Sequence, residues 1–145
     1  MAVEPAHLFV DTWGWLVLED GKDPAHALAV QVRRQQTGRG GRLVTTDYIL
    51  DETITRLFAR RPTDEAAAFC ARLFQAKKIG MLILEQITPE RFERAYQLRL
   101  RYRDKPRISF TDLTSFAVMK ELGIRQVLTA DIHFSQAHLG FEILP

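Results

Sequence analysis

Short apolar runs alternate with longer amphipathic segments along the chain, and this alternation predicts strands and helices in turn. The runs at residues 7–10, 42–45, 81–84, 126–129 and 141–144 have the length and composition of strands. Residues 48–60 place Leu50, Ile54, Leu57 and Phe58 at the spacing of one buried helix face. The pattern therefore predicts an α/β fold, in which helices cover both faces of a mostly parallel sheet of four to five strands.

Capping residues, prolines and glycines indicate where the helices begin and end. Helices are expected at residues 12–20, 25–36, 48–60 and 111–122, with two more beginning near residues 63 and 89. Asp23 with Pro24, and Thr88 with Pro89, each fit an N-cap followed by proline in the first turn. Thr63 is expected to cap a further helix. Residues 101–109 (RYRDKPRIS) form what we call the basic loop.

The composition describes an ordinary globular chain of 145 residues, which we expect to form a single domain over residues 1–145. A net charge of +2 is too small to indicate nucleic-acid binding by itself. The single cysteine, Cys70, is expected to be a small core residue. No secretory signal and no run of about 20 apolar residues is present, so we expect a cytoplasmic location and no membrane association.

Four acidic residues lie where predicted strands end or predicted helices begin: Asp11, Glu52, Asp112 and Asp131. Ligand sites of α/β sheets lie beyond the carboxyl ends of the strands. Asp11 directly follows the first predicted strand, and Asp131 comes two residues after the strand at 126–129, so both fall at this end of the sheet. Taken singly, Asp11 and Asp112 can also be explained as helix-capping residues, and Asp131 as a turn residue. The helical spacing does not choose between Glu52 and its neighbour Asp51.

Convergence of these carboxylates would require a cation. Two unit charges ~4 Å apart repel by about 4 kcal/mol at an effective dielectric constant near 20. Several such repulsions are comparable to the whole stability of a domain, about 5–15 kcal/mol. Mg²⁺ or Mn²⁺ suits an all-oxygen site, whereas zinc favours histidine or cysteine ligands. His133 and His138 lie close to Asp131 in the sequence, and we interpret both as structural or surface residues.

The segments around these acids resemble the PIN-domain nucleases, and in particular the VapC-like toxins of bacterial type II toxin–antitoxin pairs. The matching segments are FVDTW, LVTTDYILDETITRL, SFTDLTSFAVMKELGIRQVLTADIHF and GFEILP, which together span the chain. The resemblance implies a three-layer α/β/α fold and cleavage of single-stranded RNA with Mg²⁺ or Mn²⁺. It also implies a cognate antitoxin, a homodimer and metal-binding acids at Asp11, Glu52, Asp112 and Asp131, and so favours Glu52 over Asp51. Trp13 stands where this family usually has a small residue, and Asp47 where asparagine is common.

Several further residues are candidates for supporting roles. Thr12, Ser115 and Arg107 could contact the ligands or the substrate. Two basic clusters could contact phosphates, or could equally form a solvated face or a dimer contact: Arg33, Arg34, Arg39 and Arg42, and Arg99, Arg101, Arg103, Lys105 and Arg107. Trp13, Trp15 and Leu16 could form an interface, or equally part of the core.

Three other classes of protein fit part of the pattern. A phosphoacceptor receiver domain would explain acids at strand ends and Thr129, but it needs a lysine after the last strand, and none follows Lys120. A haloacid-type phosphatase needs a second aspartate at position 13, which is Trp13. A non-catalytic module that binds RNA or an antitoxin remains an alternative, although all four acids are retained.

Overall fold

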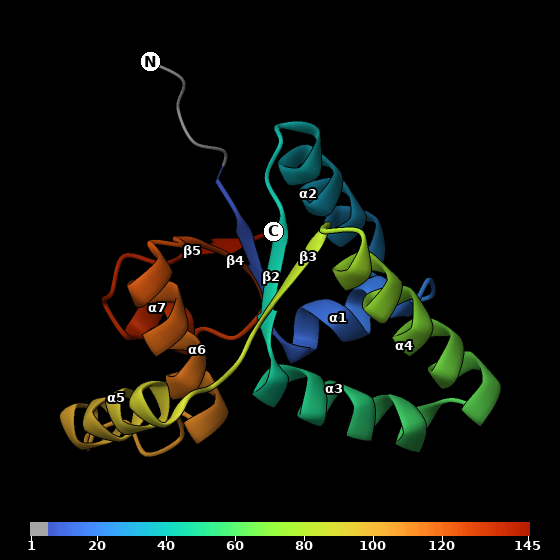
Figure 1. The fold of residues 1–145 in the computed structure, drawn as a ribbon. Helices are drawn as coiled ribbons and strands as arrows, with labels where there is room; N and C mark the ends of the chain where they lie inside the picture. The colour runs from blue at the N-terminus through green and yellow to red at the C-terminus, as the bar shows by residue number, and fades with distance from the viewer. Residues whose placement is uncertain (1–5) are drawn as a thin grey trace.

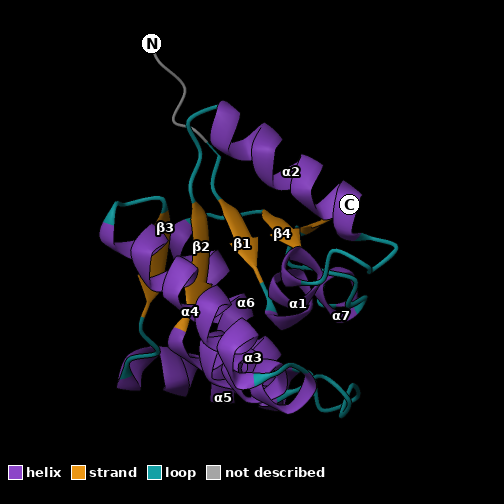
Figure 2. Cartoon of the chain, turned by 90° about the vertical axis from the view of Figure 1, so that its right-hand side faces the viewer, coloured by secondary structure: helices purple, strands orange, loops and turns teal. Residues whose placement is uncertain are grey.

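A parallel sheet of five strands runs through the middle of the molecule in the computed structural model, which describes residues 6–145 (Figure 1). The strands are β1 (Leu8–Val10), β2 (Leu43–Thr46), β3 (Leu82–Glu85), β4 (Gln126–Leu128) and β5 (Glu142–Leu144). Their order is β3-β2-β1-β4-β5, and every neighbouring pair is parallel. Figure 2 shows β3, β2, β1 and β4 side by side in this order. The prediction of a mostly parallel α/β sheet of four to five strands is confirmed.

Helices cover both faces of this sheet and complete the three-layer α/β/α arrangement. On one side lie α1 (Thr12–Glu19), α2 (His26–Gly38), α3 (Asp47–Arg60) and α4 (Thr63–Lys78) (Figure 1). On the other side lie α5 (Pro89–Arg101), α6 (Phe110–Leu122) and α7 (His133–Gln136) (Figure 1). Because all strands are parallel, their carboxyl ends meet at one edge, and the segments leaving β1 and β4 there carry Asp11 and Asp131.

Most helix boundaries follow the predicted caps, with two corrections. Thr88 caps α5 with Pro89 in its first turn, as predicted. The prediction for Asp23 is wrong, because its carboxylate accepts a hydrogen bond from the Ala25 N–H (2.8 Å) within a turn, and α2 begins only at His26. Thr63 is the first residue of α4 rather than its cap, which is Pro62.

The core lies on both sides of the central strands. All three residues of β1 are fully buried, and α6 buries every residue from Leu113 to Met119. Cys70 is buried in α4, which confirms its predicted place in the core. Trp15 and Leu16 are buried as well, so they form part of the core and cannot form the exposed interface considered above. Among residues 6–145, no helix is long and apolar enough to cross a bilayer.

Candidate active site

The four acids predicted from the sequence meet in one small cavity at the carboxyl edge of the sheet. Its volume is about 270 Å³. The lining residues come from segments far apart in the sequence: Asp11, Thr12, Trp13, Ile49, Glu52, Arg56, Arg107, Ser109, Asp112, Asp131 and His133. The structure therefore brings Asp11, Glu52, Asp112 and Asp131 together, as their shared position at strand ends and helix starts led us to expect.

Asp11 is both the N-cap of α1 and part of the cavity wall. It directly follows β1, and its Oδ1 accepts a hydrogen bond from the Gly14 N–H (2.9 Å). Its Oδ2 accepts a hydrogen bond from the Thr129 hydroxyl (2.5 Å). The residue is only 5% exposed. The capping interpretation and the site interpretation therefore both hold, because one carboxylate has two oxygens that can serve different groups.

Thr129 connects two of the acids through a single hydroxyl. Its Oγ1 donates to Asp11 and accepts a hydrogen bond from the backbone N–H of Asp131 (2.9 Å). The side chain is almost fully buried, directly after β4. Sequence reasoning considered Thr129 only for a receiver domain and missed this role. The spacing Thr129-Ala130-Asp131 is the only local signal, because the partner Asp11 lies 118 residues away.

Glu52 enters the cavity from α3 with both oxygens engaged. Oε2 accepts a hydrogen bond from the Thr12 hydroxyl (3.2 Å), and Oε1 pairs with Arg56 Nη2 at 2.8 Å. The neighbouring Asp51 is exposed and does not line the cavity. Arg56, one helical turn beyond Glu52, also lines the cavity, and sequence reasoning missed it.

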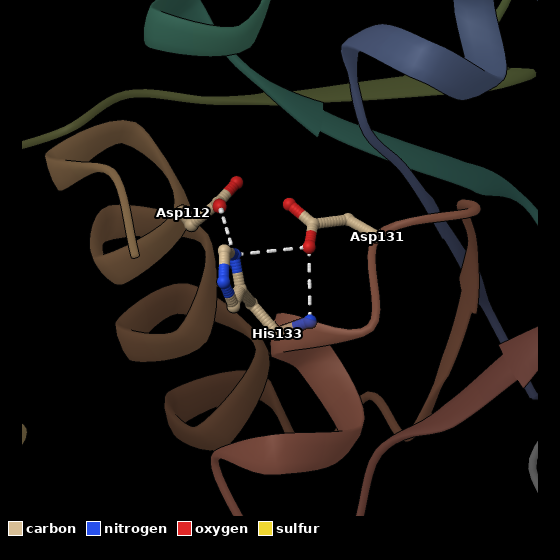
Figure 3. A group of neighbouring side chains, drawn as sticks. All are labelled: Asp112, Asp131 and His133. Atoms are coloured by element: carbon tan, nitrogen blue, oxygen red, sulfur yellow. Dashed lines mark hydrogen bonds and ion pairs between the residues drawn. The ribbon is translucent and has the colours of Figure 1, made fainter. Parts of the chain in front are cut away.

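Asp112, Asp131 and His133 form a tight group on the α6 and α7 side of the cavity (Figure 3). The Asp131 carboxylate accepts a hydrogen bond from the His133 N–H (2.9 Å). His133 Nδ1 lies 3.0 Å from Asp131 Oδ1 and 3.9 Å from Asp112 Oδ2. Neither carboxylate oxygen lies in the direction that a hydrogen bond from the imidazole ring requires. His133 Nδ1 is therefore buried without a hydrogen-bond partner within residues 6–145. His133 is therefore a site residue, contrary to the sequence interpretation, whereas His138 is exposed and lies outside the cavity.

Ionising the carboxyl groups of this cavity costs free energy, because they are buried and because neighbouring carboxylates repel one another. Desolvation is the main cause that raises the pKa of Asp112 to about 8, and the neighbouring Asp131 carboxyl adds to the rise. Desolvation likewise raises the pKa of Asp11 to about 7, against the hydrogen bonds from Thr129 and Gly14. A divalent cation would relieve this repulsion, and clustered carboxylate oxygens are the donors that Mg²⁺ and Mn²⁺ prefer. The residues therefore fit such an ion, with the His133 nitrogen as one further donor.

Comparison with known proteins identifies the family. The chain matches the PIN domain over residues 8–138. It belongs to the PIN-domain family. It is 33% identical over 139 residues to the 23S rRNA-specific endonuclease VapC20 of Mycobacterium tuberculosis, in strains CDC 1551 and H37Rv, across 95% of this chain and 98% of the relative. The resemblance seen in the sequence is thereby confirmed, and the receiver-like alternative is set aside.

Solved structures agree with this assignment. The crystal structure of M. tuberculosis VapC20, described as a sarcin–ricin loop cleaving toxin, has a TM-score of 0.76 at 30% identity, covering 90% of this chain and 95% of that one. VapBC2 from Rickettsia felis reaches 0.70 at 11% identity, with 95% and 98% covered. VapBC-5 from M. tuberculosis reaches 0.59 at 19% identity, with 97% and 98% covered. The last two show a common fold.

The remaining candidates divide into residues at the cavity of this PIN domain and residues elsewhere. Thr12 and Arg107 line the cavity, and Trp13, the unusual residue after Asp-Thr, forms part of its wall. Ser115 does not line it, because its fully buried hydroxyl donates to the Thr111 carbonyl within α6 (3.2 Å). Asp47 adds no charge to the cavity lining, because its carboxylate accepts hydrogen bonds from Tyr48 and from the Ile87 N–H after β3 (2.9 Å).

Proposed function

We propose that this PIN domain is a metal-dependent endoribonuclease that acts as the toxin of a toxin–antitoxin pair. The observation that carries the proposal is the convergence of Asp11, Glu52, Asp112 and Asp131 on one cavity. The identity of 33% with a protein named as a 23S rRNA-specific endonuclease supports RNA as the substrate class. A non-catalytic binding module would have no need for carboxylates whose pKa values are raised by mutual proximity and burial. An RNA substrate of this kind also implies a cytoplasmic location.

Asp11 and Asp112 are the proposed primary ligands of Mg²⁺ or Mn²⁺, with Glu52 and Asp131 completing the site. When bound there, such an ion would supply polarisation of a phosphodiester and a lower pKa for an attacking water. The protein's own contribution is to hold the ligands in place. Thr129 fixes the carboxylate of Asp11 and the backbone at Asp131, while Thr12 and Arg56 hold Glu52. Partners of this kind orient the ligands and raise metal affinity.

RNA must approach an acidic cavity although it is itself an anion. Arg56 on α3 and Arg107 on the basic loop both line the cavity beside the acids. Both side chains are exposed enough to contact the phosphates of an RNA strand. Such contacts orient the backbone without reading its sequence. We therefore assign to these two arginines the task of holding the strand across the acids.

The test is cleavage of total bacterial ribosomal RNA and of a mixed-sequence single-stranded RNA in Mn²⁺, with and without EDTA. We expect the wild-type protein to cleave RNA in Mn²⁺. Addition of EDTA, or either of the substitutions Asp11→Asn and Asp112→Asn, should lower the cleavage rate by more than about 100-fold. Glu52→Gln and Asp51→Asn form a matched pair, because they are adjacent in α3 but only Glu52 lines the cavity. Asp51→Asn should cut like wild type. Cleavage that survives EDTA, or that both Asp11→Asn and Asp112→Asn retain, would overturn the metal mechanism.

A cognate antitoxin is the second part of the proposal. Its support is that the VapC20 structure is described as that of a toxin. A toxin of this kind needs a protein that blocks it while the cell grows. Co-expression with the adjacent open reading frame should yield a stable complex that does not cut RNA. If neither neighbouring gene product binds the protein or reduces its cleavage, the toxin–antitoxin assignment is wrong while the nuclease assignment stands.

A further inference from the structure

Arg99, near the end of α5, directs its guanidinium inward onto the backbone of the basic loop. Nη1 donates to the Ile108 carbonyl (2.6 Å), and Nη2 donates to the carbonyls of Tyr102 and Lys105 (2.7 Å each). The sequence grouped Arg99 with the loop cations as a candidate phosphate contact. The structure separates them, because three hydrogen bonds to carbonyls hold the guanidinium of Arg99, whereas Arg103 and Arg107 are exposed.

The basic loop is anchored at a second point as well. Tyr102 is 6% exposed, and its hydroxyl donates to the Ala137 carbonyl (2.7 Å) beyond α7. Two successive turns, closed by Lys105 N–H to Tyr102 O (2.8 Å) and Ile108 N–H to Lys105 O (3.2 Å), share their acceptors with Arg99. Ile108 is buried. Although it carries four cationic side chains, the loop is therefore fixed along its backbone.

The clamped carbonyls stand on both sides of Arg107. Lys105 lies two residues before it and Ile108 directly after it, and both are held by the same guanidinium. Arg107 in turn lines the cavity that contains Asp11 and Asp112. The loop then leads into Ser109, whose hydroxyl accepts a hydrogen bond from the Asp112 N–H (3.0 Å) and so caps α6. The position of Arg107 relative to the acids is therefore set by the backbone that Arg99 holds.

We propose that Arg99 is a positioning residue for the RNA strand, because its guanidinium clamps the basic loop so that Arg107 faces the phosphodiester at the acidic cavity. This inference rests on the proposed ribonuclease function. An arginine supplies a planar fork of five donors, which can serve three carbonyls at once, whereas lysine supplies one compact ammonium. Holding the loop before RNA arrives avoids the ordering cost that a flexible cationic loop would incur on binding.

Charge-conserving substitution separates a clamp from a phosphate contact. Arg99→Lys keeps the positive charge but cannot hold three carbonyls, so a clamp loses function in both Arg99→Lys and Arg99→Gln. A direct phosphate contact would survive in Arg99→Lys. Arg101→Gln is the matched control, because Arg101 is an exposed cation two residues away on the same helix. Circular dichroism melting of each variant establishes that it is folded at the assay temperature.

The experiment combines ribosomal RNA cleavage in Mn²⁺ with amide hydrogen exchange. We expect Arg99→Lys and Arg99→Gln each to slow cleavage about 10-fold, and to speed exchange of the amide hydrogens in residues 105–109, of which Pro106 has none. Arg107→Ala should slow cleavage without changing that exchange. In the double variant Arg99→Gln/Arg107→Ala, the rate should stay within about twofold of Arg107→Ala alone, because the clamp acts through Arg107. Arg101→Gln should leave exchange in the loop unchanged.

Two results would overturn the clamp. One is cleavage by Arg99→Lys at the wild-type rate with unchanged exchange at residues 105–109. The other is a cleavage rate in Arg99→Gln/Arg107→Ala that is reduced by the product of the fold-losses of the two single variants. Such a rate would show that Arg99 and Arg107 act independently. If wild type itself cuts no RNA, the proposed function fails and this inference fails with it. If wild type cuts and Arg99→Lys matches it, only the inference fails.

Discussion

At the scale of single residues, the protonation of Asp11 and Asp112 makes the stability of the fold depend on pH. Burial raises the pKa values of these carboxyls from 3.8 to about 7 and about 8. A carboxyl whose pKa is higher in the folded state stabilises the fold fully below about pH 4, and this stabilisation is lost as the pH rises through about 7–8. The metal-free protein is therefore expected to lose stability between pH 5 and 8.

Thermal melting of Asp112→Asn against wild type measures this effect. Without metal at pH 8, the variant should be the more stable by about 1–3 kcal/mol, and the advantage should shrink toward pH 5. Mn²⁺ at ~100 times its Kd should then stabilise wild type by about 2.7 kcal/mol, and Asp112→Asn by less. Asp51→Asn is the control with an exposed carboxylate. If the stability difference between Asp112→Asn and wild type does not change with pH, the pKa of Asp112 is not raised in the folded protein.

The residues that sequence reasoning missed have roles that depend on where the folded chain points their side chains. The type of residue alone does not reveal such a role. The four acids could be predicted because each lies at a strand end or helix start, and because the surrounding segments resemble PIN domains. Thr129 and Asp11 are joined across 118 residues by one hydroxyl. The Arg99 donors meet carbonyls, which every residue has and no sequence pattern marks. His133 shares a short segment with Asp131, yet only the turn into α7 brings its ring to the acids.

At the scale of elements, α1 must pack very closely on the ends of β1 and β4, and Gly14 permits this. A Cβ at Gly14 would lie 2.6 Å from the Leu128 carbonyl oxygen and 2.8 Å from Val10 Cγ1. The Gly14 N–H also donates to Asp11. Gly14→Ala is therefore expected to cost about 1–3 kcal/mol of unfolding free energy, because α1 must move away from the strands and disturb the Asp11 carboxylate.

Urea denaturation and RNA cleavage measure the two consequences. Gly38→Ala is the matched control, since a Cβ there meets no atom of residues 6–145 within 4 Å, and its effect should stay within about 0.5 kcal/mol. Cleavage should fall in Gly14→Ala even at temperatures where the variant is fully folded, and remain at the wild-type rate in Gly38→Ala. Equal stability of the two variants would contradict the close approach of α1 to β4.

The strands were predictable at this scale because short buried runs leave a clear pattern. Each of the five lies within one residue of its expected bounds, for example 42–45 against Leu43–Thr46. The start of α2 was not predictable, because Asp23 can accept a hydrogen bond from the backbone two residues on as readily as it can cap a helix. Local chemistry allows both outcomes, and the turn that connects α1 to α2 decides between them.

At the scale of the whole molecule, an apolar stripe remains exposed on α5. Phe92, Tyr96 and Leu100 follow one another at intervals of four residues, so they lie on one helix face, and they are 46%, 44% and 45% exposed. The sequence suggested an interface at Trp13, Trp15 and Leu16, but two of those side chains belong to the core. The homodimer remains a prediction, and this stripe is the surface that we propose for it.

A two-fold symmetric dimer would place the same stripe of both subunits in contact, so one substitution alters the interface twice. Tyr96→Glu would set two carboxylates against each other in an apolar contact, and should convert the protein to a monomer at micromolar concentration. Gln97→Glu adds the same charge one residue further along α5, about 100° around the helix, and should leave the dimer intact. Analytical ultracentrifugation of wild type and both variants decides the question. A wild type that sediments as a monomer, or a Tyr96→Glu variant that remains a dimer, would rule out this face as the dimer interface.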